Sequence, residues 1–395
     1  MFEIVGKYNS AKVFADLVES EAQSQIMDMC NIKEFKDNKI RIMPDVHAGK
    51  GCTIGTTMTI NGRIIPDMVG VDIGCGMLWG KIDAKDLDLY AFHLTVSDNI
   101  PAGTNVNKDM PDGLFDLESL RCHRALKKKE RVYKSIGSLG GGNHFIEVDK
   151  SDDGTLYLVI HSGSRNLGKQ VAEYYMREGV EAMRMRNSNE LKDIIDSCKA
   201  AGLEKQINDK VKECLEEQTL SKWGIIESSL FDDYIHDMKL VQEFARINRD
   251  MIMDTICKKA GISVTDRIHT VHNYIDTDSM IMRKGAVSAK EGERLLIPLN
   301  MRDGSLICVG KGNPDWNYSA PHGAGRLFSR SKTKEIFDVP TFKDVMEGVY
   351  SKTVGSSTLD ECPMAYKPYK TNMNGLGDTV EVVERIKSIY NFKAS

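Results

Sequence analysis

Five of the nine histidines lie in glycine- or asparagine-rich turns or at the ends of expected strands. They are His47 in PDVHAGKG, His144 in GGGNHFIE, His161 in VIHSGSRN, His272 in VHNYI and His322 in SAPHGAGR. Rigid scaffolds often display functional side chains at such places. Neighbouring glycines remove side-chain bulk and let a phosphate approach the backbone. The pattern therefore indicates metal binding or phosphate chemistry.

A carboxylate and a thiol stand three residues apart in the segment VGVDIGCGM, as Asp72 and Cys75. A thiolate with a nearby carboxylate can hold one metal ion or bridge two, and imidazoles close by are typical of a transition-metal site. Taken singly, the signals are weak. A cysteine beside glycine, like His161 on its apolar strand, is more often a buried structural residue, and Asp72 could cap a turn. The residue types alone predict a metal site of open chemistry.

The other four histidines are weaker candidates for metal binding. His93, His123 and His236 lie on charged or helix-like stretches, so we expect structural roles for them. His269 precedes His272 by three residues, and we expect it to be a neighbour of that residue and not a ligand.

These side chains must be positioned by a mixture of strands and helices. Short strands broken by glycine are expected at 39–43, 53–60, 63–71 and 77–82, and a buried strand at 155–161. The glycine-poor, charged segment 168–260 is expected to form several amphipathic helices. Strands return over 263–309, a helix is expected to begin near Arg326, and another is expected at 378–389. The pattern predicts one interwoven α+β domain.

Composition limits the class of protein. The 395 residues are 41% hydrophobic and 28% charged, which is ordinary for a soluble globular chain. The net charge of −4 means that a nucleic acid would need a local basic surface. The nine cysteines form no CxxC pair, which favours a reducing compartment. With no signal-peptide pattern and no membrane-length apolar stretch, the expected location is the cytoplasm and no membrane contact is expected.

Eight short motifs, taken in order, carry a resemblance to a known family. They are MPDVHAGKGCTIG, VGVDIGCGM, GGGNHFIE, HSGSRNLG, HNY, RKGAVSA, SAPHGAGRLFSR and PMAYK, and they run from about residue 40 towards the end of the chain. In this combination the chain resembles the RtcB family of RNA ligases, which act on 3′-phosphate ends. The resemblance implies a single RtcB-like domain over residues 1–395. Its central β-sheet or sandwich core would be flanked by helices, with a helical insertion at about 168–260.

The resemblance also implies two Mn²⁺ ions. Their ligands would be Asp72, Cys75, His144, His161 and His272, with the thiolate between the two ions. The histidine of HGAGR, here His322, would carry GMP covalently on an imidazole nitrogen after reaction with GTP. The residue chemistry agrees, because a histidine nucleophile is neutral near pH 7 and two metal ions can neutralise a triphosphate.

Contacts to the guanylate are implied for a further set of residues. They are Asn143, His144, Phe145, Ile146, Glu147, His272, Asn273, Pro298, Leu299, Asn300, Met301, Ser305, His322, Gly323, Ala324, Gly325, Tyr366 and Lys393. Glu147 can accept hydrogen bonds from guanine N1–H and the exocyclic amine, which adenine does not offer in the same way. Arg165 and Arg330 are expected to bind RNA phosphates bidentately.

One loop departs from the family pattern. The usual IPGSMG reads IPLNMRDG here, so Leu299 and Asn300 stand where glycine and serine are usual, and Arg302 follows. GTGNH has become GGGNH, and the chain continues two residues past Lys393. The sequence therefore predicts the end-joining reaction more firmly than a strict preference for GTP.

The implied reaction joins an RNA 3′-phosphate or 2′,3′-cyclic phosphate end to a 5′-hydroxyl end, through a histidine–GMP intermediate and an RNA–ppG end, in tRNA splicing or RNA repair. A dinuclear metal-dependent phosphoesterase would explain the metal-binding residues but gives His322, Glu147 and Lys393 no role. A non-enzymatic RNA-binding module leaves the metal-binding residues unexplained. The sequence leaves open the RNA substrate, the oligomeric state and whether the helper protein archease is needed.

Overall fold

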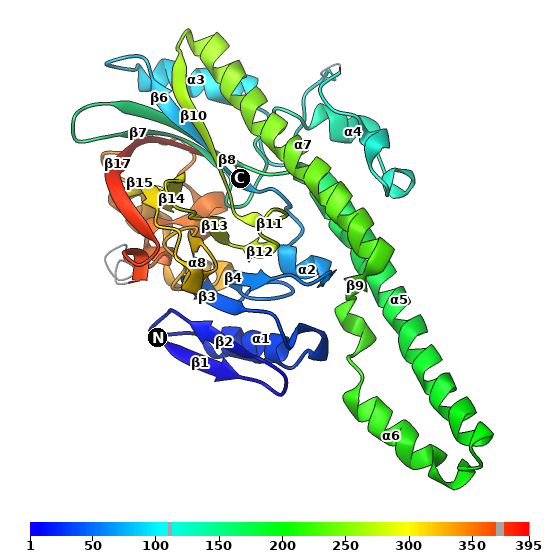
Figure 1. Ribbon diagram of the computed structural model, residues 1–395. Helices are drawn as coiled ribbons and strands as arrows, with labels where there is room; N and C mark the ends of the chain where they lie inside the picture. Colours follow the sequence, from blue (N-terminus) through cyan, green and yellow to red (C-terminus); the bar gives the residue numbers. More distant parts are fainter. Residues whose placement is uncertain (110–112, 369–374, 395) are drawn as a thin grey trace.

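The computed structural model describes residues 1–109, 113–368 and 375–394, and its largest elements are two β-sheets with helices on their outer faces (Figure 1). The mixed α+β class expected from the sequence is confirmed. One sheet has six strands in the order β1-β2-β3-β4-β12-β11. Their bounds are β1 Phe2–Val5, β2 Ser10–Val13, β3 Ile40–His47, β4 Ile54–Thr59, β12 Ile281–Lys284 and β11 Asn273–Asp276.

The second sheet has seven strands in the order β10-β6-β8-β7-β17-β15-β14. Their bounds are β10 Val264–Val271, β6 Gly76–Ile82, β8 Leu156–Ser162, β7 Phe145–Lys150, β17 Val380–Lys393, β15 Gly304–Gly310 and β14 Arg294–Asn300. The sheet curls, so that apolar side chains of β6, β7 and β8 pack against those of β14, β15 and β17, with Trp79, Val159 and Ile307 among them. Its outer face is covered by helices α3 and α7.

Two small ribbons, nine α-helices and several short 3-10 helices accompany the sheets in the described part of the chain. The ribbons pair β13 (Ala286–Ser288) with β16 (Ser319–Pro321) and β5 (Arg63–Ile64) with β9 (Ile226–Glu227). The α-helices are α1 Ser20–Cys30, α2 Pro66–Val69, α3 Leu89–Asn99, α4 Lys129–Lys134, α5 Arg165–Ala200, α6 Ile207–Glu217, α7 Ser228–Ala260, α8 Arg330–Ile336 and α9 Val339–Val345. Among the described residues, no helix is both long and apolar enough to cross a membrane.

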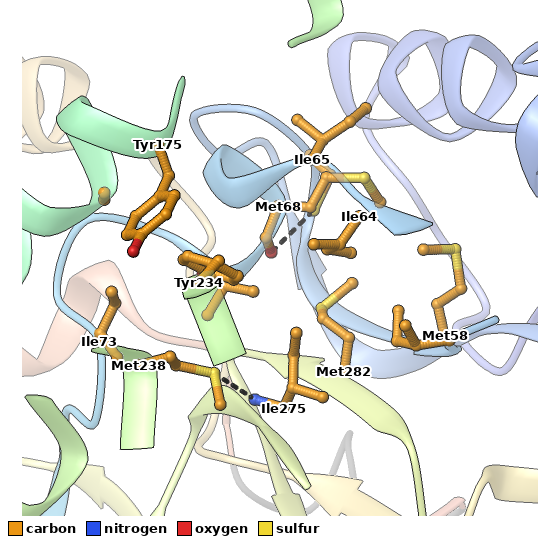
Figure 2. Packing of buried hydrophobic residues seen from close by; sticks show 14 of the residues in the cluster. Met58, Ile64, Ile65, Met68, Ile73, Tyr175, Tyr234, Met238, Ile275 and Met282 are labelled. Carbon is orange, nitrogen blue, oxygen red and sulfur yellow. Dashed lines mark hydrogen bonds between the residues drawn. The ribbon is translucent and has the colours of Figure 1, made fainter. Parts of the chain in front are cut away.

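The helical segment expected at 168–260 consists of α5, α6 and α7. Helices α5 and α7 run side by side, while the hairpin of α5 and α6 extends beyond the sheets (Figure 1). Tyr175 of α5 and Tyr234 and Met238 of α7 pack into a buried cluster that also contains Ile275 and Met282 of the six-stranded sheet (Figure 2). Helix α7 is therefore held firmly against the strands that border the candidate site.

Three sequence predictions differ from the structure. The helix expected at 378–389 is wrong, because residues 380–389 belong to β17, which lies between β15 and β7. The strand expected at 63–71 ends at Ile64, since Pro66 begins helix α2 and cannot donate to a ladder. The helix expected near Arg326 begins four residues later, at Arg330.

Candidate active site

Four strand ends bring together the side chains expected to bind metal. Asp72 and Cys75 lie in the turn before β6, His144 directly precedes β7, His161 lies near the end of β8, and His272 lies between β10 and β11. Because β10, β6, β8 and β7 are consecutive antiparallel neighbours, these positions fall at one end of the sheet. All five residues, which span 201 positions of sequence, therefore meet at one place.

The donor atoms of this cluster converge. The Sγ atom of Cys75 lies 3.4 Å from Nε2 of His144 and 3.3 Å from Nε2 of His161. The Oδ2 atom of Asp72 lies 3.1 Å from the same nitrogen of His144. Two groups of three ligand atoms, each within 4.8 Å of one another, share Cys75: one adds His161 and His272, and the other adds Asp72 and His144.

The orientation of the imidazoles suits metal binding. Nδ1 of His144 faces the carbonyl of Leu139 at 3.0 Å, and Nδ1 of His161 faces the carbonyl of Asn143 at 3.1 Å. A ring nitrogen that faces a carbonyl must donate, so Nε2 of each ring is left to face Cys75. Metal-binding histidines usually donate their second ring nitrogen in this way. Imidazole, thiolate and carboxylate donors form a set that fits a transition metal.

Burial and neighbouring charges set the protonation of the cluster. Burial lowers the pKa of His161 and of His272 well below that of a free imidazole, so both rings are neutral at pH 7. Burial would raise the pKa of Asp72, but its contact with Nε2 of His144 and the hydrogen bond from the backbone N–H of Ser164 lower it to about 2. Burial raises the pKa of the Cys75 thiol well above its usual value. A bound cation would reverse this effect, because a coordinating thiol loses its proton.

His322 lies next to this cluster and outside its two groups of ligand atoms. Its ring centroid is 5.1 Å from that of His272. The carboxylate of Asp45, which is fully buried, accepts a hydrogen bond from the backbone N–H of His322 and lies 2.8 Å from Nδ1 of its ring. This contact assigns the proton to Nδ1 and leaves the lone pair on Nε2 for attack on an electrophile.

Asp45 was not expected from the sequence to belong to the site, although it lies in the motif MPDVHAGKG. It is the only acidic residue in that stretch. His47 lies two residues further on, and its Nδ1 atom is 2.9 Å from the carbonyl of Asp45.

A pocket of about 380 Å³ opens beside His322, a size that suits a nucleotide. Fourteen of the residues expected to contact guanylate line it: Asn143, Phe145, Glu147, His272, Pro298, Leu299, Asn300, Met301, His322, Gly323, Ala324, Gly325, Tyr366 and Lys393. The other four lie elsewhere. His144 belongs to the metal cluster, Ile146 packs in the outer core of the sheet, Asn273 borders a neighbouring pocket, and Ser305 is fully buried in β15.

The neighbouring pocket, of about 200 Å³, borders the metal cluster. Asp72 and Cys75 line it, and so do Lys50 and Lys284. His322 borders both pockets. The imidazole therefore stands between a nucleotide-sized space and the candidate metal ligands.

Glu147 lies in the larger pocket as a buried carboxyl group. Burial raises its pKa to about 8, while a hydrogen bond from Asn391 and the charge of Lys393 act in the opposite direction. Asp149, two residues along β7 and therefore on the same face, is also fully buried, and burial raises its pKa well above the usual value. Burial therefore favours the protonated form of Glu147 near neutral pH.

Glu361 also lines this pocket and was not expected from the sequence to do so. It accepts a hydrogen bond from Tyr366 at 2.6 Å and pairs with Lys393 at 2.9 Å, Arg330 at 2.8 Å and Arg326 at 3.3 Å. Burial would raise its pKa, but the charges of Lys393 and Arg330 lower it to about 2. Glu361 precedes the motif PMAYK by two residues, and it holds several pocket side chains in place.

At two positions in the site, neighbouring residues lie so close to the backbone that only glycine fits. A Cβ atom on Gly163 would lie 2.2 Å from Oδ1 of Asp72. Gly285, in the motif RKGAVSA, has a φ of +57°, and a Cβ atom there would lie 2.1 Å from Ile54 and 3.2 Å from His322. These clashes explain why side chains are missing beside the candidate ligand and the candidate nucleophile.

The altered loop is accommodated by the fold. Leu299 lines the pocket and also packs in an apolar cluster with Leu306 and Leu376. The side chain of Asn300 accepts hydrogen bonds from the backbone of Arg302 and Asp303 at 3.0 Å each, so it stabilises the turn between β14 and β15.

The two arginines expected to bind RNA occupy different surroundings. Arg165 begins α5 and donates to Ser138 at 3.1 Å and to the carbonyl of Gly103 at 3.0 Å. It lines a hollow of about 440 Å³ that also contains Lys128, Arg131 and Lys169. Arg330 is exposed at the start of α8 and borders the nucleotide-sized pocket, where Asp360 and Glu361 pair with it.

The four histidines expected to be structural make contacts outside the metal cluster. The ring of His93 packs near Tyr350, Tyr390 and Phe392. His123 and His236 bond to the backbone carbonyls of Leu120 and Ser119, and His269 lies 3.1 Å from a carboxylate oxygen of Asp250.

Comparisons with known proteins show what the chain is similar to. A family model described as tRNA-splicing ligase RtcB matches residues 25–118 and 117–394. The chain is 28% identical over 414 residues to RNA-splicing ligase RtcB of Escherichia coli (strain K12), covering 94% of each chain. It is 26% identical over 469 residues to tRNA-splicing ligase RtcB of Archaeoglobus fulgidus, covering 96% of this chain and 90% of the relative. It is also 26% identical over 427 residues to tRNA-splicing ligase RtcB of Aeropyrum pernix, with 82% and 81% covered.

Proposed function

The chain belongs to the RtcB family of tRNA-splicing ligases, and from this premise we propose that it uses GTP and Mn²⁺ to join RNA ends. One end would carry a 3′-phosphate or a 2′,3′-cyclic phosphate, and the other a 5′-hydroxyl. We propose further that the whole chain acts as one ligase domain. The observation that supports the chemistry most directly is the position of His322, which borders both a nucleotide-sized pocket and the candidate metal ligands.

The first step would be attack by Nε2 of His322 on the α-phosphorus of GTP. A nitrogen–phosphorus bond forms, the bond to the bridging oxygen breaks, and pyrophosphate leaves. Asp45 holds the proton on Nδ1, so that Nε2 carries the lone pair, and it stabilises the positive ring that results. Glu147 would accept hydrogen bonds from guanine, and Lys393 and Tyr366 would complete the guanylate contacts.

The next steps would transfer GMP to the RNA 3′-phosphate and release it again. An oxygen of the 3′-phosphate attacks the phosphorus on His322, which gives the RNA–ppG end and frees the histidine. The 5′-hydroxyl then attacks the RNA phosphate and expels GMP. A 2′,3′-cyclic phosphate would first take up water and open to the 3′-phosphate.

Asp72, Cys75, His144, His161 and His272 would hold the two Mn²⁺ ions. Bound Mn²⁺ would neutralise the phosphate oxygens and stabilise the leaving groups. Arg165, with the basic side chains of its hollow, would bind the RNA backbone. Arg330 would contact a phosphate near the nucleotide.

Intact-mass spectrometry tests the proposal. After incubation with GTP and Mn²⁺, the protein should gain the mass of one GMP, because the histidine adduct is covalent. Omitting Mn²⁺ should prevent the gain, and the adduct should disappear when RNA with a 3′-phosphate and RNA with a 5′-hydroxyl are added. Release of phosphate from RNA without any adduct would instead favour a metal-dependent phosphoesterase.

Changing Glu147 should alter both base choice and pH dependence. With a pKa of about 8, Glu147 must lose a proton to accept two hydrogen bonds from guanine, so GMP affinity should fall as pH falls through that value. The loss should be several-fold between about pH 8.5 and about pH 7. Glu147→Gln should remove this slope and narrow the preference for GMP over AMP, because an amide both donates and accepts.

Equilibrium binding of GMP and AMP to metal-free protein measures both effects without interference from ligation. Asp149 is the other buried carboxyl group on the same face of β7, and this residue is still present in Glu147→Gln. If Glu147→Gln keeps the full pH slope, the titrating group is not Glu147. An unchanged ratio of GMP to AMP affinity would place base recognition elsewhere in the pocket.

A further inference from the structure

Two adjacent polar residues in the middle of helix α7, Asn248 and Arg249, are completely buried, with exposed fractions of 0% and 1%. Burial of a guanidinium and an amide is unfavourable unless their hydrogen-bonding groups are satisfied. In this protein their partners come from the segments that carry the candidate metal ligands. Neither residue lines the two pockets beside His322.

Arg249 connects three of these segments. One terminal nitrogen donates to the carbonyl of Gly74 at 2.8 Å and to the carbonyl of Ser162 at 2.9 Å. Gly74 directly precedes Cys75, and Ser162 directly follows His161. The Nε atom of Arg249 donates to Nδ1 of His269 at 3.3 Å, on the strand that leads to His272.

Asn248 connects the segment before His144 to the segment that follows His161. Its side-chain oxygen accepts from the backbone N–H groups of Gly137 at 2.8 Å and Ser138 at 3.1 Å, at the start of the glycine-rich turn before His144. Its side-chain nitrogen donates to the hydroxyl of Ser162 at 3.0 Å and to the carbonyl of Gly163 at 3.1 Å. All four hydrogen bonds that an amide can form are therefore made.

The hydrogen bonds continue from Arg249 through His269 to Asp250. With Nδ1 of His269 accepting from Arg249, the other ring nitrogen is free to donate to Asp250, 3.1 Å away. Helix α7 is anchored by its own apolar face, where Tyr234 and Met238 lie in the buried cluster of Figure 2. A fixed helix thus presents a fixed pair of polar side chains to the loops.

We propose that Asn248 and Arg249 are positioning residues, which hold the four ligand-bearing segments in register so that the metal site is formed before a metal ion binds. The proposal rests on the proposed metal-binding role of Asp72, Cys75 and the three histidines. Two features favour positioning over simple stabilisation. A well-packed apolar pair would stabilise a buried helix face at least as well, and the hydrogen bonds of the pair reach the backbone beside the ligands.

Metal titration of purified apo-protein tests this role without any measurement of ligation. Co²⁺ is the probe, because thiolate coordination gives a charge-transfer absorption that reports the bond to Cys75. Arg249→Met keeps side-chain bulk but loses the hydrogen bonds, and it should weaken Co²⁺ binding by about 10- to 100-fold and reduce the absorption. Arg249→Lys keeps the positive charge but loses the planar guanidinium group. Its Co²⁺ affinity should lie between those of Arg249→Met and the wild type.

The control is Ile256→Ala, a change to a fully buried residue further along α7. It should lower the unfolding temperature and leave Co²⁺ affinity unchanged, because Ile256 packs against the outer face of the sheet. If Arg249→Met does not fold, His269→Leu takes its place. That ring is half-buried, and its loss should weaken Co²⁺ binding by a few-fold.

The outcomes separate this inference from the proposal on which it rests. If the wild type binds no Co²⁺ through Cys75, the ligand assignment itself fails. If the wild type binds Co²⁺ and the Arg249 and His269 variants bind it equally well, the ligands are correct and the positioning role is wrong. Equal loss of affinity in Ile256→Ala would also overturn the positioning role, since it would show that general destabilisation is sufficient.

Discussion

His322→Ala should form no enzyme–GMP adduct and should leave 3′-phosphate RNA unjoined, with a loss of ligation of at least about 10³-fold. The reason is that the imidazole is the proposed nucleophile and alanine offers no lone pair. The variant should nevertheless bind Mn²⁺ like the wild type, because His322 stands outside both groups of candidate ligand atoms. Intact-mass spectrometry, RNA ligation and metal analysis of the same sample measure the three properties.

The same variant can also test the order of the steps. A chemically prepared RNA–ppG end bypasses the nucleophile, so His322→Ala should still catalyse attack by the 5′-hydroxyl on that end. His161→Ala is the comparison, because it removes a proposed metal ligand and should fail with both substrates. Failure of a metal-loaded His322→Ala on the pre-activated end would give this histidine a second role in the last step. An adduct on His322→Ala would show that the nucleophile is another residue.

The residue types alone indicate a metal site only weakly, and the set of five candidate ligands follows from the resemblance to the RtcB family. Asp72 and Cys75 stand between glycines, His144 and His272 stand beside an asparagine, and His161 lies near the end of an apolar strand, two residues before Gly163. The sequence does not show that these residues lie close together, because their proximity depends on the order of β10, β6, β8 and β7 in one sheet.

The supporting residues were harder to predict, because their signal lies in three-dimensional contacts. Asp45 and Glu361 are ordinary acidic residues until the fold buries them beside His322 and Lys393. Asn248 and Arg249 lie within a long charged helix, where polar residues are usually exposed to solvent. Their burial against the strand ends follows from the packing of α7, which the helical pattern alone does not determine.

The wrong prediction at 378–389 has a similar cause. The spacing of charged residues in VEVVERIKSIYNF fits an amphipathic helix, but the segment is also rich in β-branched residues. Pairing on both sides, with β15 and with β7, decides in favour of the strand. The result matters for the site, because β17 carries Lys393 to the nucleotide-sized pocket and pairs Asn391 with Glu147.

Cys75→Ala should remove Mn²⁺ and abolish both guanylylation and ligation, while the protein stays folded. Cys75 is the one residue common to both groups of candidate ligand atoms, so its loss leaves each group with two. Replacing one sulfur atom in so large a chain should change the unfolding temperature of the metal-free protein by no more than about 3 °C. Ligation should fall by at least about 10³-fold, because both proposed ions lose a ligand.

Metal content after dialysis, circular dichroism and the two enzyme assays measure these effects. Cys52→Ala is the matched control, because Cys52 is also buried, its thiol donates to the carbonyl of Met68 at 3.6 Å, and it belongs to neither group. It should keep its metal and its activity. Loss of metal in both variants would mean that removal of a buried thiol disturbs the fold in general. Normal guanylylation by Cys75→Ala would contradict the ligand assignment, because the first chemical step would then proceed without the residue that joins the two halves of the site.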